Sequence, residues 1–273
     1  MTETNHPDLW RGRIPWPGAD SHKHARGRLG VVSGDAAHTG AARLAARAGL
    51  RVGAGLVKVF CPLEAAAVLV PALEAVMLSP FATTAELVAA AEPMGAVVIG
   101  PAAGVTEATR ENVRGLATLE TRLVLDADAL TVFADTPEAL FDLLGPQDVL
   151  TPHEGEFGRL FPGLLAAGRE TAAVEAARRA GCVVVLKGAK TLVTAPDGRR
   201  RINPNGSPWL ATAGTGDVLA GLIGGLLAQG VEAFEAASMA VWMHADAAGR
   251  FGPGLTAEDL PDLIPAVLRE LYG

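Results

Sequence analysis

The chain has 273 residues, of which 49 % are hydrophobic and 5 % aromatic, and its formal net charge is −7. This length supports a sizeable core in one large domain or two small ones. The acidic balance argues against a nucleic-acid binder, because that affinity depends on Lys and Arg against the phosphate backbone. No apolar run approaches the length of a membrane span, so we expect no membrane partner.

Residues 1–25 are polar and contain several prolines, which predicts an N-terminal loop or arm. The segment lacks the apolar stretch of a secretory signal. Cys61 and Cys182 stand far apart without a metal-binding or redox spacing, so we expect two reduced thiols packed in the core. Together these features predict a cytoplasmic protein.

Short apolar runs alternate with helical segments along most of the remaining chain. Strands are predicted at residues 28–34, 56–61, 96–100, 122–127, 148–151 and 182–188. This alternation is typical of an α/β fold, in which right-handed crossovers place helices on both faces of a parallel sheet. Ligands of such sheets bind at the carboxyl ends of the strands.

The pattern changes at residues 191–204, where two short strands flank the turn-forming residues Pro196, Asp197 and Gly198. We expect an antiparallel hairpin at the edge of the sheet. Three helical segments follow, at residues 215–230, 232–251 and 256–273. Because no shift in composition divides the chain, residues 1–273 are predicted to form a single domain.

The stretch "ATAGTGDVLAG" at residues 211–221 places Gly214, Gly216 and Asp217 at the start of an apolar helix. The free backbone N–H groups of such a helix start attract anions, and glycine lets a phosphate approach closely. A carboxylate there is expected to stay ionised and to be a weak base. The alternative is that Asp217 only caps the helix and the glycines only form a turn. The stretch is neither a P-loop nor a dinucleotide fingerprint.

Six motifs in a fixed order resemble those of the ADP- or ATP-dependent NAD(P)H-hydrate dehydratases, a branch of the ribokinase-like superfamily. They occupy residues 30–59, 97–104, 123–130, 150–160, 183–193 and 213–230. The resemblance extends from about residue 23 to about residue 244. It implies a three-layer α/β/α sandwich with a mostly parallel central sheet.

The same resemblance implies a metabolite repair reaction. A nucleotide, ADP or ATP, phosphorylates the hydroxyl of the S form of hydrated NADH or NADPH (NADHX or NADPHX), and loss of phosphate restores the reduced cofactor. Asp217 is implied to be the catalytic residue that receives the hydroxyl proton. The implied substrate-binding residues are Ala41, Gly100, Gly104, His153 and Asp217.

The nucleotide is assigned by resemblance to the "KGAKT" motif and the helix start. The implied nucleotide-binding residues are Lys187, Gly188, Ala189, Lys190, Thr191, Gly214, Thr215 and Gly216. Lys187 or Lys190 could neutralise phosphate charge. The general alternative is that lysines after a strand are ordinary solvated residues.

His153 and Glu156 match the spacing of the superfamily's Asn-x-x-Glu element, which implies that Glu156 arranges Mg²⁺ through water. A zinc site is disfavoured, because HEGE is not HExxH. His244 is interpreted as a packing or helix-surface residue.

Two further motifs carry weaker predictions. Asp126 is placed by resemblance near the phosphate and metal region, whereas Asp128 is interpreted as a structural residue that caps the following helix. In "GPAAG", Ala102 replaces a glycine of the family's Gly-Pro-Gly-Leu-Gly loop.

The resemblance also implies partners. We expect a homo-oligomer, for which a tetramer is one form, and functional pairing with a separate NAD(P)HX epimerase, because no epimerase domain is expected in residues 1–273. One alternative is a ribokinase-like kinase that acts on a vitamin-precursor alcohol and releases a stable phosphate ester. Another is a non-enzymatic module that senses a nucleotide.

Overall fold

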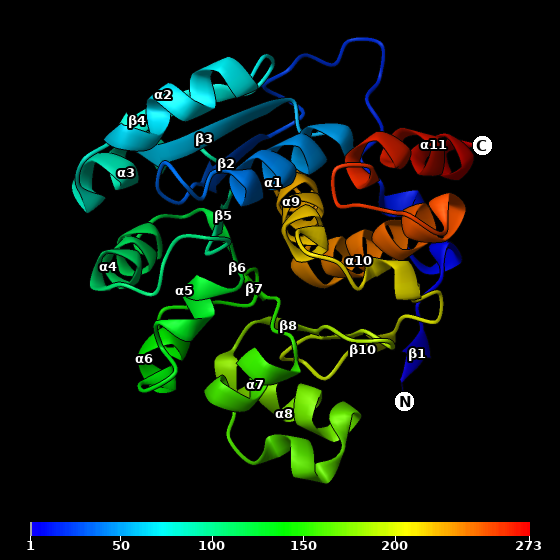
Figure 1. The fold of residues 1–273 in the computed structure, drawn as a ribbon. Coiled ribbons are helices and arrows are strands. Elements are labelled where there is room, and N and C mark those ends of the chain that lie inside the picture. The colour runs from blue at the N-terminus through cyan, green and yellow to red at the C-terminus, as the bar shows by residue number, and fades with distance from the viewer. Residues whose placement is uncertain (1) are drawn as a thin grey trace.

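One sheet runs through residues 2–273, which are the residues that the computed structural model describes (Figure 1). Its strand order is β1-β10-β9-β8-β7-β6-β5-β2-β3-β4. The strands are β1 (Glu3–Thr4), β2 (Arg28–Val32), β3 (Leu56–Pro62), β4 (Met77–Phe81), β5 (Ala96–Ile99), β6 (Arg122–Leu125), β7 (Val149–Leu150), β8 (Val183–Leu186), β9 (Leu192–Thr194) and β10 (Arg200–Ile202). β9 is antiparallel to β8 and β10, and the other neighbours pair in parallel. The predicted mostly parallel sheet with an antiparallel hairpin is confirmed.

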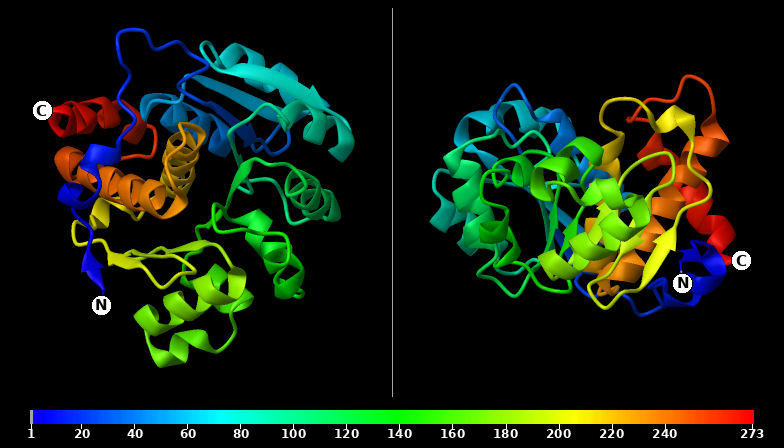
Figure 2. Two further views of the ribbon diagram at one scale, coloured as in Figure 1. Left: turned by 180° about the vertical axis from the view of Figure 1, so that it is seen from behind. Right: turned by 90° about the horizontal axis from the view of Figure 1, so that it is seen from below.

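Helices cover both faces of this sheet, as the views in Figures 1 and 2 show. They are α1 (Gly40–Arg51), α2 (Ala66–Leu69), α3 (Thr84–Ala91), α4 (Glu107–Leu116), α5 (Asp128–Thr131), α6 (Pro137–Phe141), α7 (Glu154–Leu160), α8 (Arg169–Ala180), α9 (Thr215–Ala228), α10 (Ala233–Phe251) and α11 (Leu260–Tyr272). Helices α1, α9, α10 and α11 share one core with the sheet, and α3 to α8 share the other. In β5, Ala96 and Val98 point into the first core while Val97 and Ile99 point into the second. The expected three-layer sandwich is therefore confirmed.

The N-terminal arm differs from its prediction. Residues 3–4 form β1, which pairs in parallel with β10, and two 3-10 helices follow at Pro7–Leu9 and Arg11–Arg13. The arm is anchored by Trp10, whose buried indole Nε1 donates to Asn5 Oδ1 at 3.0 Å. The prediction of a loop is wrong for this part, because tertiary contacts order a segment whose own propensity is low. β1, and not the predicted hairpin, therefore forms that edge of the sheet.

β4 was also missed, because the sequence of Met77–Phe81 includes Pro80 and lacks a continuous apolar run. β4 is the other edge strand, where a proline is tolerated since one side of the strand needs no backbone partner.

Helix α9 is packed close to the centre of the first core. Its residues from Val218 to Ala228 are buried, and α1 lies against it. The contact is close because Gly221 has no side chain: a Cβ there would come within 2.2 Å of Ala45 O. This packing fixes the start of α9 at the carboxyl edge of the sheet.

The sheet has a topological switch point between β2 and β5. The chain leaves β2 for α1 on one face and leaves β5 for α4 on the other, although these two strands are neighbours. A crevice at the carboxyl ends is the usual consequence of such a reversal. Among the described residues, no helix is both long and apolar enough to traverse a lipid bilayer.

Candidate active site

The turn ahead of α9 holds Asp217 in a defined position. Gly214 has φ of 88°, and a Cβ there would lie 2.8 Å from Ala257 Cβ, so a side chain is excluded by conformation and by space. The Thr215 hydroxyl donates to Leu210 O at 2.9 Å and to Thr212 O at 3.1 Å. These contacts fix the loop of residues 210–215 against the helix start.

Asp217 lies in the first turn of α9 and is half-buried. Within residues 2–273, no side chain caps this helix start, and the Asp217 carboxylate accepts no hydrogen bond from another described residue. The capping alternative therefore has no support from the geometry. The carboxylate is left available to an incoming group.

A charged cluster beside Asp217 comes from the ends of β6, β7 and β8. Lys187 Nζ lies 2.7 Å from Asp126 Oδ1 and 3.8 Å from Glu156 Oε2. The same Asp126 oxygen accepts from Ala127 N at 2.9 Å, and Ala127 has φ of 48°, which is strained for a residue with a Cβ. A Cβ at Gly216 would lie 3.6 Å from Lys187 Nζ, so the cluster faces the start of α9.

The basicity of Asp217 differs from the sequence-based expectation. Burial, with the neighbouring Asp126 carboxylate as the second cause, raises the pKa of Asp217 to about 6, while Lys187 acts in the opposite direction. Asp217 is a stronger base than the sequence predicts, because desolvation and a second carboxylate outweigh the helix N-terminus. Asp217 is thus ionised near neutral pH and well suited to accept a proton.

His153 and Glu156 form a capping box at the start of α7. His153 Nδ1 accepts from Gly155 N at 2.9 Å and from Glu156 N at 3.3 Å, and Glu156 Oε2 accepts from His153 N at 2.8 Å. One nitrogen of the exposed imidazole is thus used within the protein. His153 Nε2 remains at the surface, 3.4 Å from Glu156 Oε1.

A cavity of about 650 Å³ opens beside this cluster and is termed the β8–α9 cavity. Of the predicted nucleotide-binding residues, Lys187, Gly188, Ala189, Thr191, Thr215 and Gly216 line it. Lys190 is exposed, and neither it nor Gly214 is among the lining residues. Lys187 is therefore the lysine that the structure places next to both the cavity and the carboxylates.

His244 belongs to the wall of the β8–α9 cavity, which the sequence interpretation missed. The side chain is buried, and its Nε2 has no hydrogen-bond partner among the described residues. Burial lowers the pKa of His244 to about 4, so the ring is neutral. The packing interpretation holds for burial, but the unpaired nitrogen also makes His244 a candidate ligand contact. The available signal was a polar residue within the apolar stretch "AVWMHADAA".

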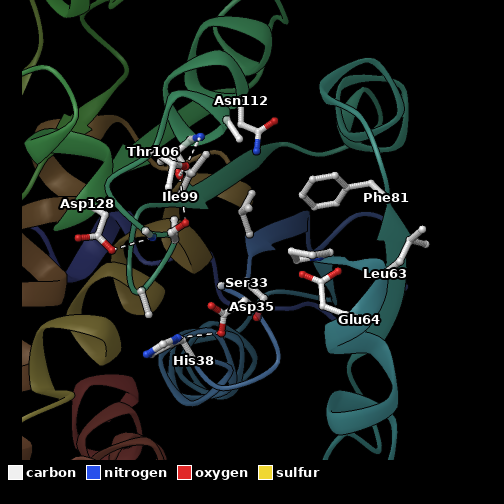
Figure 3. A pocket seen from close by; sticks show the side chains of 18 of the residues that line it. Ser33, Asp35, His38, Leu63, Glu64, Phe81, Ile99, Thr106, Asn112 and Asp128 are labelled. Atoms are coloured by element: carbon white, nitrogen blue, oxygen red, sulfur yellow. Dashed lines mark hydrogen bonds and ion pairs between the residues drawn. The ribbon is translucent and has the colours of Figure 1, made fainter.

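A second cavity, of about 640 Å³, lies at the carboxyl ends of β2, β3, β4 and β5 and is termed the β2–β5 cavity (Figure 3). Gly104 lines it, whereas Gly100 and Ala41 are not among the lining residues. Gly100 has φ of 122°, and a Cβ there would come within 1.8 Å of Asp126 O, so close packing requires this glycine.

Two residues near Gly104 bear on the loop of residues 100–104. Asp128 Oδ2 accepts a hydrogen bond from Gly104 N at 2.8 Å, so Asp128 ties down this loop and the prediction that it caps its own helix is wrong. Its structural role stands. Ala102 has φ of 56°, which is the left-handed conformation that a glycine at this position would adopt without strain.

Residues 29–266 match the protein family described as NAD(P)H-hydrate dehydratase. This match includes Asp126, Glu156, Lys187 and Asp217. The chain belongs to the NAD(P)H-hydrate dehydratase family.

Two curated members of this dehydratase family illustrate the relationship. The chain is 38 % identical over 257 residues to the ADP-dependent (S)-NAD(P)H-hydrate dehydratase of Neisseria meningitidis. The aligned region covers 91 % of this chain and 83 % of that protein. The chain is 38 % identical over 282 residues to the bifunctional NAD(P)H-hydrate repair enzyme Nnr of Salinibacter ruber, with 96 % of this chain and 52 % of that protein covered. The chain thus spans about half the length of the bifunctional dehydratase relatives it matches.

Solved structures support the dehydratase fold. The ADP/ATP-dependent NAD(P)H-hydrate dehydratase of Bacillus subtilis, co-crystallized with ATP/Mg²⁺, superposes with a TM-score of 0.84 at 28 % identity and 99 % coverage of each chain. A ribokinase-like superfamily protein of Enterococcus faecalis gives a TM-score of 0.87 at 24 % identity, over 99 % of this chain and 96 % of the other, which shows the fold alone. The ribokinase-like architecture expected of a dehydratase is therefore confirmed.

Proposed function

We propose that the protein uses ADP or ATP to dehydrate the S form of NADHX or NADPHX, which repairs the damaged cofactor. The observation that carries this proposal is the unpaired Asp217 carboxylate, whose pKa of about 6 suits a base and which stands at the start of α9 beside Lys187. Membership of the dehydratase family supports the choice of substrate.

The nucleotide is proposed to occupy the β8–α9 cavity. Lys187 and the backbone at Gly216 supply positive charge and N–H donors where the terminal phosphate would lie. Asp126 holds Lys187 by the 2.7 Å ion pair, which fixes the position of the ammonium group beside the cavity. We propose that Thr191, Gly188 and Ala189 line the sugar and base, and that Lys190 and Gly214 act only through the shape of their loops.

The hydroxyl of the hydrated nicotinamide is proposed to meet the phosphate in front of Asp217. Its oxygen attacks the terminal phosphorus, the bond to the leaving nucleotide breaks, and Asp217 accepts the hydroxyl proton. The carbon–oxygen bond of the resulting phosphate ester then breaks, and loss of a proton from the adjacent carbon restores the double bond. Inorganic phosphate and the shorter nucleotide, AMP from ADP or ADP from ATP, leave.

Substrate contacts are proposed for His153 through its surface-exposed Nε2 and for Gly104 in the β2–β5 cavity. Gly100 shapes the loop of residues 100–104 by its close approach to Asp126 O. Ala41, in the first turn of α1, is proposed to touch the substrate from the opposite side of the switch point.

Mg²⁺ is proposed to accompany the nucleotide. Within residues 2–273, no set of three or more His, Cys, Asp or Glu side chains is placed to hold a metal unaided. This arrangement fits an ion that phosphates and water mostly coordinate, with one or two carboxylates nearby. Asp126 Oδ2, which makes no hydrogen bond to a described residue, and Glu156 through water would hold it. When bound, the ion would neutralise phosphate charge during transfer.

Exposed apolar side chains support a proposal about the oligomeric state. The exposed apolar side chains Leu63, Val68, Val70 and Met77 surround edge strand β4, which supports a homo-oligomer that buries them. Light scattering of Val70→Lys should give a smaller particle than the parent chain. We also propose a single domain, cytoplasmic placement in line with the two buried free thiols Cys61 and Cys182, and pairing with an NAD(P)HX epimerase activity that supplies the S form.

The deciding experiment incubates the protein with NADHX, Mg²⁺ and either ADP or ATP. Recovery of the reduced-nicotinamide absorbance with stoichiometric phosphate release is expected with at least one nucleotide. Accumulation of a stable phosphate ester of another alcohol, without repair, would instead support the vitamin-precursor kinase. Nucleotide binding with no turnover of any substrate would support a sensing module.

A further inference from the structure

The β2–β5 cavity and the β8–α9 cavity lie at two separate parts of the same edge of the sheet. In the sheet order, the β8–α9 cavity adjoins β8, the residues around Asp217 follow β6 and β7, and the β2–β5 cavity lies on the far side at the switch point. A dinucleotide with its nicotinamide at Asp217 has its other end free to extend away from the bound nucleotide. A volume of about 640 Å³ is ample for a nucleoside.

The charged side chains that line the β2–β5 cavity are acidic. Asp35, Glu64 and Asp128 line it, while none of the described lining residues is Lys or Arg. Asp35 is paired with His38 at 2.7 Å, and Asp128 is used by Gly104 N. The exposed Glu64 carboxylate makes no hydrogen bond or ion pair with a described residue, and Figure 3 shows it directed into the cavity below Phe81.

Two further polar groups in the wall lack a partner. The Ser33 side chain is 3 % exposed, and its hydroxyl makes no hydrogen bond among the described residues. Asn112 uses its Oδ1 to accept from Thr84 Oγ1 at 2.7 Å, which leaves its Nδ2 to point toward the cavity, opposite Glu64 (Figure 3). The cavity therefore offers a carboxylate acceptor on one side and an amide donor beside an aromatic ring on the other.

These groups match an adenosine whose ribose hydroxyls are free. A carboxylate accepts from both hydroxyls of a ribose, as it does in NAD-selective folds, and an amide donor suits a ring nitrogen of adenine. A 2′-phosphate would bring two negative charges next to Glu64 and Asp35 with no cation in the described wall to offset them.

We propose that the β2–β5 cavity binds the adenosine end of the hydrated dinucleotide, with Glu64 on the ribose hydroxyls, and thereby selects NADHX over NADPHX. The inference rests on the proposed repair function for the identity of the substrate. The contacts themselves are a separate property of the cavity.

The test measures binding without requiring turnover. The nucleotide site of the full chain is first filled with a non-hydrolysable ATP analogue, and ADP-ribose and 2′-phospho-ADP-ribose are then titrated by calorimetry. The parent protein should bind ADP-ribose at least about tenfold more tightly than its 2′-phosphate. Glu64→Lys should lower the preference for ADP-ribose over its 2′-phosphate by about tenfold, because the variant replaces repulsion of the phosphate by attraction.

The matched control is Glu92→Lys, which makes the same charge change at an exposed residue beside the start of β5, at the opposite edge of the sheet. It should leave the ratio as in the parent. Asn112→Ala should weaken both ligands by about the same factor, since it removes a contact to the base. Equal binding of the two ligands by the parent protein, or the same ratio in Glu64→Lys and Glu92→Lys, would overturn the proposal.

The repair assay separates this inference from the proposed function. If NADHX is repaired but the titration shows no binding of ADP-ribose to the protein, the cavity proposal fails and the proposed function stands. If ADP-ribose binds with the expected ratio but no repair occurs, the function fails and the cavity still binds an adenosine.

Discussion

The two cavities at the carboxyl edge have almost equal volumes, about 650 and 640 Å³, but opposite character. The β8–α9 cavity is lined by Lys187 and by the first residues of α9, Thr215 and Gly216, which suits phosphate. The β2–β5 cavity is lined by carboxylates and by residues of four strand ends spread over the chain. Its chemistry comes from topology, whereas that of the β8–α9 cavity comes from two short motifs. We therefore propose that the β8–α9 cavity holds the phosphoryl donor and that the β2–β5 cavity determines which substrate binds.

The largest expected loss of activity comes from a change at Asp217, which lies at the start of α9. Asp217→Asn should lower kcat by about 10³-fold, because the variant cannot accept the hydroxyl proton, while the affinity for nucleotide changes little. Calorimetry with ADP and ATP together with the repair assay would measure both. Parallel losses of binding and turnover would show that Asp217 belongs to the nucleotide side alone.

The same variant should be more stable at neutral pH. The folded-state pKa of Asp217, about 6, lies above the ordinary aspartate value of 3.8, so its stabilising contribution is complete below about pH 4 and is lost as the pH rises through 6. Removing the buried charge should therefore raise the free energy of unfolding at pH 7 by about 1–3 kcal/mol. Urea unfolding at pH 4 and pH 7 would test this, with a gain expected only at pH 7.

Lys187→Met tests the β8–α9 cavity by itself, because Lys187 lines that cavity and not the β2–β5 cavity. Loss of the ammonium group leaves Asp126 and Glu156 without their cation, and kcat should fall by about 10²-fold. Because Lys187 lowers the pKa of Asp217, the acid limb of the kcat/KM–pH profile, which reports the free enzyme, should move to higher pH than its expected position near 6 in the parent. An unchanged limb would show that Asp217 does not control it. Lys190→Met, at an exposed lysine outside the lining, is the matched control.

His244→Phe should have a moderate effect confined to the β8–α9 cavity. The variant keeps the buried ring and removes the unpaired Nε2, so the Kd for the nucleotide should rise by about 3- to 10-fold. ADP-ribose binding in the β2–β5 cavity should not change. An unaltered nucleotide Kd would show that His244 does not contact the nucleotide and only packs in the core.

Ala102→Gly should have the smallest effect, on the β2–β5 side. The left-handed conformation at φ of 56° favours glycine, so the variant should be more stable by about 1 kcal/mol in thermal unfolding. Ala103→Gly, at a neighbouring residue without positive φ, is the control and should not be stabilised. A loss of stability in Ala102→Gly would show that the loop carries no strain.

The sequence predicted the structure around the β8–α9 cavity better than the structure around the β2–β5 cavity. Runs such as residues 182–188 and the start of α9 carry their structure locally, through β-branched residues and a glycine turn. β1 and β4 were missed because tertiary pairing, and not local propensity, forms them. Glu64 and Asn112 lie almost fifty residues apart in the chain, so no local motif could indicate that they face one cavity.

The character of single residues was harder to predict than their position. Asp217 was placed correctly at the start of a helix, but its basicity depends on burial and on Asp126, which follows β6 far away in the sequence. Asp128 is the first residue of α5, next to the capping position, yet its carboxylate accepts from the Gly104 backbone N–H instead. Such partners are set by the three-dimensional packing of loops.

The most direct test of phosphoryl transfer to the substrate hydroxyl follows the oxygen of that hydroxyl. NADHX prepared in water enriched in heavy oxygen is incubated with the protein, Mg²⁺ and nucleotide, and the released phosphate is analysed by mass spectrometry. If the hydroxyl attacks phosphorus in front of Asp217 and the carbon–oxygen bond then breaks, each phosphate carries one labelled oxygen. Label found in water, with unlabelled phosphate, would show that the hydroxyl leaves directly and would contradict the mechanism.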